Sequence, residues 1–114
     1  MKTAAYFILT LLFFTGCSKS DQQTSNTNST EMTAVIQVPT AKCESCEATI
    51  TKAVKSVNGV KTVEMNLDKK EIKVTYASII DIDAIRLAIV NAGYDADSTK
   101  RNSDSYSKLD ECCQ

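Results

Sequence analysis

The order of hydrophobic patterns between about residues 32 and 97 constrains the fold of this chain more than any other feature of its sequence. A β-rich run from Thr33 to Val38 ends at Pro39, the only proline in the chain. Apolar residues then recur at helical spacing from about Cys46 to Val57, and Asn58-Gly59 ends this pattern. The first part of the stretch is therefore predicted to be a strand followed by a helix.

Three further elements are predicted after this helix. They are a hairpin of two alternating stretches (60–67 and 72–76), a second helix (about 82–91) and a short last strand, Tyr94-Asp95-Ala96. Asp81 is the predicted N-cap of the second helix, and Gly93 is its predicted C′ residue.

These elements follow one another in the order β-α-β-β-α-β, which is the split βαβ plan. Both helices would pack on one face of an antiparallel four-stranded sheet, so the predicted fold class is α+β. The chain has 114 residues, which allows one small domain. Only about 65 residues carry its core, so the domain has little margin of stability, and a bound ion would add to it.

The first sixteen residues are predicted to lie outside the fold. Lys2 precedes an apolar run from Ala4 to Phe14, which is shorter than the about 20 residues of a bilayer span but fits a secretory signal. Phe14-Thr15-Gly16-Cys17 resembles a bacterial lipobox, so residues 1–16 are predicted to be a lipoprotein signal peptide and Cys17 to carry lipid. The alternative is an ordinary signal peptide with an incidental cysteine.

The resemblance to a lipobox implies a place in the bacterial cell envelope, where a lipid anchor would hold the chain on a membrane. Ser18 follows the cysteine and weakly favours the periplasmic face of the outer membrane. Residues 17–31 are the predicted linker. Ser18 to Thr30 contains no apolar residue and is expected to be disordered.

Histidine is absent, which removes the commonest general base, the commonest metal ligand and any Ser-His-Asp site. The three glycines are scattered and form no phosphate loop, and a net charge of −1 gives no basic excess that would attract nucleic acid. We therefore expect no enzyme and no nucleic-acid partner. A metal site would have to rest on carboxylates or on the five cysteines.

Cys43 and Cys46 are the candidate metal ligands. They stand between the first strand and the first helix, and their spacing lets both sulfurs converge on one ion. Backbone N–H groups and the positive end of the helix dipole favour thiolate there, which is the form that binds metal. Lys42 should assist this effect, whereas Glu44 and Glu47 should oppose it.

The CxxC motif, the hairpin and two further motifs, Val57-Asn58-Gly59-Val60 and Asn91-Ala92-Gly93-Tyr94, resemble the heavy-metal-associated domain family. This family includes copper chaperones, the amino-terminal domains of copper-exporting ATPases and periplasmic mercury scavengers. The resemblance covers residues 32–97 and implies a ferredoxin-like βαββαβ fold with two-thiolate coordination of Cu(I) or a similar ion. Thr40-Ala41 stands where the family usually has Gly-Met, and Tyr94 matches the aromatic residue that bacterial members place near the loop.

Cu(I) is the ion that we expect first, because two thiolates without imidazole suit a soft ion with few ligands. Ag(I) and Hg(II) meet the same requirement, whereas a structural Zn(II) would find two of its four positions open. The resemblance implies a metal donor or acceptor as partner, such as a metal-transporting ATPase. Two alternatives stay open: a thiol–disulfide redox lipoprotein of thioredoxin type, and a scaffold with a structural disulfide.

Residues 98–114 are polar and are predicted to form a flexible tail, with a short helix near 105–111. Because adjacent cysteines bond each other only with strain, Cys112 and Cys113 have easier fates in a disulfide to another chain, in pairing with Cys43 or Cys46, or in metal ligation. Our hypothesis is that the tail folds back and lends both thiolates to the ion, which would form a tetrahedral site that also suits Zn²⁺ or Cd²⁺. The alternative is a reactive tail without a metal role.

Overall fold

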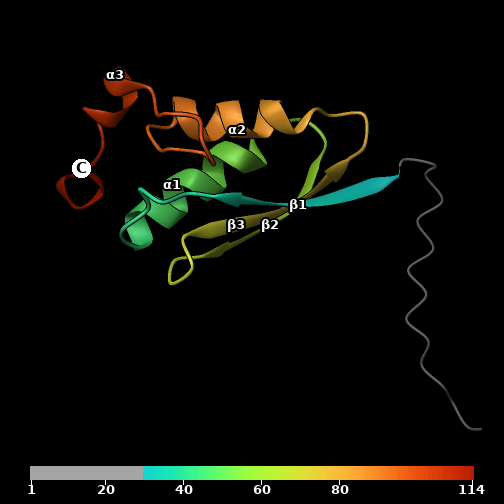
Figure 1. The fold of residues 1–114 in the computed structure, drawn as a ribbon, viewed down its shortest axis with the longest axis horizontal. Helices are drawn as coiled ribbons and strands as arrows, with labels where there is room; N and C mark the ends of the chain where they lie inside the picture. The colour runs from blue at the N-terminus through green and yellow to red at the C-terminus, as the bar shows by residue number, and fades with distance from the viewer. Residues whose placement is uncertain (1–29) are drawn as a thin grey trace, which may run out of the picture.

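The computed structural model describes residues 30–114, so the predicted signal peptide, the predicted lipidation residue Cys17 and the predicted linker up to residue 29 lie outside the described residues. Within the described part, two long helices cover one face of a three-stranded antiparallel sheet (Figure 1). None of the helices in residues 30–114 has the length and apolar character that crossing a membrane requires.

The strands run in the spatial order β1-β3-β2. In chain order the elements are β1 (Glu31–Gln37), α1 (Glu44–Lys55), β2 (Val60–Asn66), β3 (Glu71–Ala77), α2 (Ile82–Asn91), α3 (Ser103–Tyr106) and the 3₁₀ turn η1 (Glu111–Cys113). The predicted first strand, hairpin and two helices are all present.

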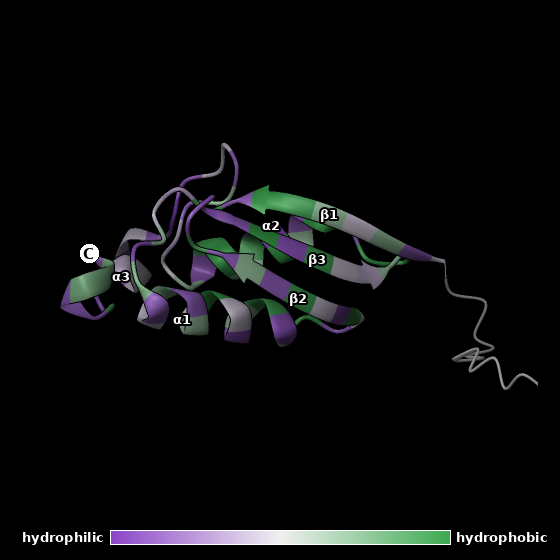
Figure 2. Cartoon of the chain, turned by 90° about the horizontal axis from the view of Figure 1, so that it is seen from below, coloured by the Kyte–Doolittle hydropathy of each residue, from purple (hydrophilic) through white to green (hydrophobic). Residues whose placement is uncertain are grey.

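The core lies between the sheet and the two long helices. Ile72 of β3 pairs with Ile36 of β1 and with Met65 of β2, so apolar side chains of three strands lie side by side. Figure 2 shows the alternation of hydrophobic and hydrophilic residues along the strands. Ile50 of α1 and Ile85 of α2 are fully buried against this face. The period of two in the strands and of 3.6 in the helices therefore produces one apolar layer.

Local signals place the ends of α2. The carboxylate of Asp81 accepts the backbone N–H of Asp83 at 3.0 Å, as expected of an N-cap. Gly93 follows the C-cap with φ +101°, a conformation that glycine adopts without strain. α1 begins at Glu44, earlier than predicted, because Cys43 serves as its N-cap residue without a capping side chain.

The segment Tyr94-Asp95-Ala96 differs from the predicted fourth strand. Among residues 30–114 it forms only an isolated bridge between Ala96 and Thr99, and the sheet has three strands. The carboxylate of Asp95 accepts the backbone N–H of Arg101 at 3.0 Å, which folds the chain back on itself. Asp97 lies in this turn with φ +51°; its backbone N–H donates to the Gln37 carbonyl oxygen at the end of β1, and its carboxylate accepts the Gln37 N–H, both at 2.8 Å. A side-chain contact thus replaces the strand ladder.

The C-terminal residues, predicted to be flexible, instead pack across the end of α2 and reach the start of α1 (Figure 1). The side chain of Asn102 accepts the N–H groups of Asp104 and Ser105 and so begins α3. The Arg101 guanidinium lies 3.8 Å from the centre of the Tyr106 ring. These contacts are long-range or involve very short elements, so periodicity in the sequence does not show them.

Candidate metal centre

The start of α1 positions the first two candidate ligands, Cys43 and Cys46. Cys43 has extended backbone angles (φ −142°, ψ 172°), and no side-chain hydrogen bond caps the helix there. Cys46 lies in the first turn of α1 and is fully buried. Because residues three apart lie on one side of a helix, the two Sγ atoms converge to 3.3 Å. The structure therefore brings these two predicted site residues together.

The loop before Cys43 is held from both sides. Val38 N–H donates to the Lys70 carbonyl oxygen at 2.7 Å, and the Lys70 ammonium donates to the carbonyl oxygen of Ala41. Ala41 is fully buried, and the Thr40 hydroxyl accepts the N–H of Asp95 at 3.0 Å. Thr40-Ala41 thus fixes the loop to the core and to the segment that follows α2.

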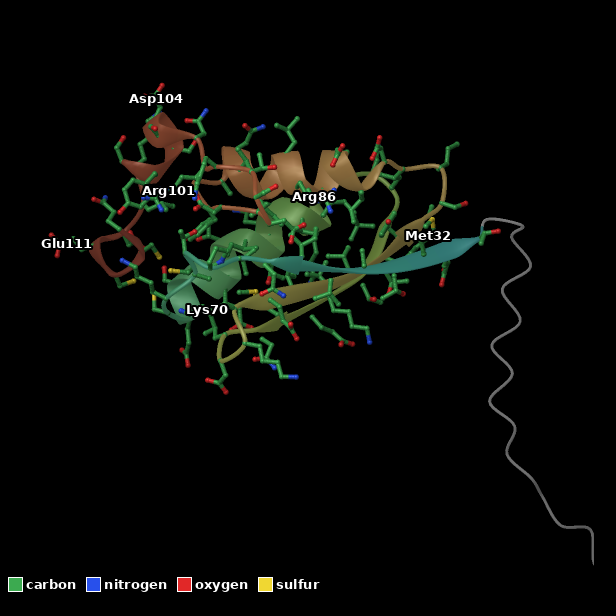
Figure 3. All side chains as sticks on the ribbon, viewed as in Figure 1. Met32, Lys70, Arg86, Arg101, Asp104 and Glu111 are labelled. Carbon is green, nitrogen blue, oxygen red and sulfur yellow. The ribbon has the colours of Figure 1, made fainter. Side chains whose placement is uncertain are left out.

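Both tail cysteines lie at the same point of the fold. Cys43 Sγ is 2.7 Å from Cys112 Sγ and 3.6 Å from Cys113 Sγ, and the two tail sulfurs are 3.8 Å apart. The sulfurs of Cys43, Cys112 and Cys113 all lie within 4.8 Å of one another. Sulfur atoms, yellow in Figure 3, gather between the C-terminal turn and the start of α1. The four cysteines of residues 30–114 are all free thiols.

Cys43 and the two tail cysteines differ in the pKa of their thiols. A hydrogen bond from Cys112, followed by the backbone N–H of Cys46, lowers the pKa of Cys43 from 9.0 to about 6. The same contact with Cys43 raises the pKa of Cys112. Burial, followed by the hydrogen bond with Cys46, raises the pKa of Cys113 to about 12. In the metal-free state Cys43 is therefore mostly thiolate at neutral pH, whereas Cys113 stays protonated.

Tyr94 lies beneath the sulfurs and is fully buried. Within the described part of the chain its hydroxyl has no hydrogen-bond partner. Burial first, and the adjacent thiols of Cys113 and Cys46 next, raise the pKa of Tyr94 far above its ordinary value. An unpaired buried hydroxyl costs about 1–3 kcal/mol, and it gains an acceptor once a neighbouring thiol becomes a thiolate. This hydroxyl therefore favours an anionic sulfur cluster.

Two polar contacts outside the cluster join the tail to the loop and to α1. The Lys42 ammonium donates to the carbonyl oxygen of Gln114, and the Ser45 hydroxyl donates to the Asp110 carboxylate at 3.0 Å. Lys42 was expected to act on the thiolates, whereas Ser45 and Asp110 were not predicted at all. Ser45 and Asp110 are 65 positions apart in the sequence, and such a pairing leaves no local signal.

Residues 35–95 match the sequence profile of the heavy-metal-associated domain, which covers more than half of the chain and includes Cys43 and Cys46. The chain belongs to the heavy-metal-associated domain family. Cys112 and Cys113 lie outside the matched residues. No significant match is found among curated proteins.

Solved structures of other proteins resemble this heavy-metal-associated domain. Oxidized MerP from Ralstonia metallidurans CH34 is 26% identical, with a TM-score of 0.57 over 59% of this chain and 94% of that protein. The mercury-bound form of MerP, the periplasmic protein of the bacterial mercury detoxification system, is 29% identical, with a TM-score of 0.53 over 60% and 96%. The yeast copper transporter domain, solved in apo and Cu(I)-loaded states, is 26% identical, with a TM-score of 0.54 over 57% and 90%.

The candidate ligands that the described residues bring together are all cysteines, and the chain has no histidine. Thiolates prefer soft ions, and two of them suffice for an ion that accepts few ligands. Four thiolates fill a tetrahedral shell. The residues present therefore fit a soft metal ion as cargo.

Proposed function

We propose that this domain binds a soft metal ion through Cys43 and Cys46, with Cu(I) as the first candidate and Hg(II) or Ag(I) as alternatives. The observation that carries the proposal is the convergence of the two sulfurs to 3.3 Å at the start of α1. The mercury-bound MerP and the Cu(I)-loaded yeast domain support the choice of ion.

The two thiols have different parts in this binding. Cys43 is half-buried and meets an incoming ion first, whereas Cys46 is buried and closes the pair from inside. Binding of Cu(I) forms two sulfur–copper bonds and displaces any proton that the thiols still hold, which leaves a centre of charge −1. The N–H groups at the start of α1 stabilise that charge. The function is carriage or sequestration of the ion without catalysis.

Exchange of the ion with a partner follows from the same geometry. A thiolate of a donor or acceptor protein reaches the ion from the solvent side, and ligands exchange without free metal being released. By family resemblance, a metal-transporting ATPase is the partner class that we propose.

Cu(I) competition tests the site. The full chain carrying Cys17→Ala, reduced and metal-free, should take Cu(I) from a strong chelator, one ion per chain. Cys43→Ser/Cys46→Ser should weaken binding by roughly 1,000-fold or more, because both soft ligands are lost. Ser56→Ala, at the far end of α1, is the matched control. Unchanged Cu(I) affinity in the double variant would show that the site is wrong, and a parent that only cycles between dithiol and disulfide would favour the redox alternative.

The envelope location is a separate part of the proposal, and the lipobox at Phe14 to Cys17 supports it. Replacing Cys17 by Ala should abolish lipid labelling and release soluble or uncleaved protein. Membrane fractions washed with salt measure this directly. Equal retention of the parent and the Cys17→Ala chain would refute the anchor and leave the metal site untouched.

A further inference from the structure

We propose that the tail completes a four-thiolate centre in which Cys43, Cys46, Cys112 and Cys113 together hold a tetrahedral divalent ion such as Zn²⁺ or Cd²⁺. This inference rests on the proposed function, since Cys43 and Cys46 belong to both sites. The family match ends at residue 95, so the second pair of ligands lies outside the matched domain.

Three sulfur–sulfur distances are close to those of a tetrahedral site. Cys46 lies outside the group of three sulfurs that are all within 4.8 Å of one another, so it would have to approach the tail sulfurs as an ion enters. A Zn–S bond of about 2.3 Å implies sulfurs about 3.8 Å apart. The pairs Cys43–Cys46, Cys43–Cys113 and Cys112–Cys113 measure 3.3, 3.6 and 3.8 Å. The Cys43–Cys112 pair, at 2.7 Å, would have to lengthen as an ion enters. The 3.8 Å between the adjacent tail cysteines suits chelation of one ion and is far from the about 2.05 Å of a disulfide.

The tail is docked by contacts that do not involve sulfur. A Cβ on Gly93 would lie 3.0 Å from the backbone nitrogen of Tyr106 and 3.1 Å from Cδ1 of Leu109, so the tail packs against this glycine. Leu109 is partly buried against the core. Asp110 then reaches Ser45 on α1. These contacts deliver the two tail thiols to the cluster before any ion binds, which lowers the entropic cost of ligation.

Groups that can stabilise the negative charge of the metal-loaded centre lie beside it. Four thiols would form four sulfur–metal bonds with M²⁺ and give up their protons, which leaves a net charge of −2. The start of α1 faces this charge, and the Tyr94 hydroxyl beside Cys46 and Cys113 can donate to thiolate. Lys42 lies next to the cluster through its bond to Gln114. A two-coordinate ion needs none of the tail, so the tail distinguishes tetrahedral from two-coordinate ions.

Two titrations of the full chain test this centre, with Cys17→Ala in every protein so that four thiols remain. Cd²⁺ is followed by thiolate-to-metal charge-transfer absorbance, which counts the coordinating sulfurs, and Zn²⁺ affinity is measured against a chromophoric chelator. Cys112→Ser/Cys113→Ser should halve the Cd²⁺ absorbance and lower Zn²⁺ affinity by roughly 100-fold or more, because two ligands are lost. Cu(I) affinity should change by less than roughly tenfold. Glu111→Gln, which leaves all thiols in place, is the matched control.

Because Cys113 is buried, replacing it can disturb the local packing. A second variant therefore leaves Cys113 in place. Cys112 is exposed, so Cys112→Ser leaves the core intact and should remove about a quarter of the Cd²⁺ absorbance. Full absorbance and parental Zn²⁺ affinity in both variants would overturn the four-thiolate centre while leaving Cu(I) binding at Cys43 and Cys46 standing. Loss of Cu(I) binding in Cys43→Ser/Cys46→Ser would support the proposed function and would not test the role of the tail.

Discussion

The two cysteine pairs of this protein meet at one point but are held there by unequal parts of the fold. Cys43 and Cys46 are separated by one helical turn of α1, whose inner face is fixed in the core by Ile50 and Val54. Cys112 and Cys113 lie on a three-residue turn at the end of the chain, and exposed polar contacts with Lys42 and Ser45 join that turn to the loop and to α1.

The two pairs have the same chemistry but differ in how firmly the fold holds them in position. All four thiols have the same donor atom, yet a helix in the core cannot leave the site without unfolding, whereas a docked tail can open locally at small cost. We therefore propose that the helix pair creates the site and that the tail pair tunes which ion it prefers. Three measurements test this contrast.

The largest effect is expected in the alkylation of the metal-free, reduced protein. At pH 7 Cys43, with its pKa lowered to about 6, is mostly thiolate, whereas Cys113, with its pKa raised to about 12, is protonated and buried. Because thiolate is the nucleophile, iodoacetamide should modify Cys43 at least ~100-fold faster than Cys113, as mapped by mass spectrometry. The rate at Cys43 should fall as the pH drops through about 6.

The variant Cys112→Ala tests whether the tail lowers the pKa of Cys43. The hydrogen bond from Cys112 is the largest cause of the lowered pKa of Cys43, so Cys112→Ala should move the pH profile of Cys43 upward. Glu111→Gln should leave the profile in place. A profile that already centres near the ordinary 9.0 in the parent would mean that the tail does not reach Cys43 in solution.

A smaller effect is expected from displacing the docked tail. Gly93→Ala places a Cβ 3.0 Å from the backbone of Tyr106, and its φ of +101° adds strain. We expect Zn²⁺ affinity to fall roughly tenfold, as about 1.4 kcal/mol of docking is lost, with little change for Cu(I). Gly59→Ala is the matched control, since Gly59 also has a positive φ (+92°) and its Cβ would meet the side chains of Ile80 and Ala77, neither of which belongs to the tail.

The two glycine variants separate docking from general instability. Both should lower the free energy of unfolding, because alanine is strained at positive φ. Only Gly93→Ala should weaken Zn²⁺ binding. Equal losses of Zn²⁺ affinity in both variants would mean that the tail is not held at Gly93.

Much of the fold followed from the sequence because its signals are local. The bounds of α2 agree with the prediction, since Asp81 and Gly93 mark its ends within the chain itself. The hairpin follows from alternation around one turn. The helix pair of cysteines was placed correctly for the same reason, because a CxxC motif at a helix start determines its own geometry.

The parts of the fold that the sequence did not predict depend on contacts that leave no periodic pattern in the sequence. The fourth strand is absent from the described part because Asp95 bonds Arg101 and not a neighbouring strand. The docking of the tail depends on the space that Gly93 leaves for Tyr106, and α3 has only four residues, too few for a periodic pattern. That glycine was interpreted as a helix stop, and its second role as a docking surface has no separate signal.

The smallest effect concerns the single hydrogen bond between α1 and the tail. Ser45→Ala removes the 3.0 Å bond to the Asp110 carboxylate, which is worth about 0.5–1 kcal/mol at a partly exposed site. Zn²⁺ affinity should therefore fall about two- to fivefold, while Cu(I) affinity stays the same. Because so small a change has other possible origins, Ser45→Ala is combined with Asp110→Ala in a double-mutant cycle. If the bond couples the tail to α1, the second substitution adds little once the first is made. Fully additive losses would show that the tail reaches the sulfurs without this contact, and the contrast between the two cysteine pairs would then rest on Gly93 and on the sulfurs themselves.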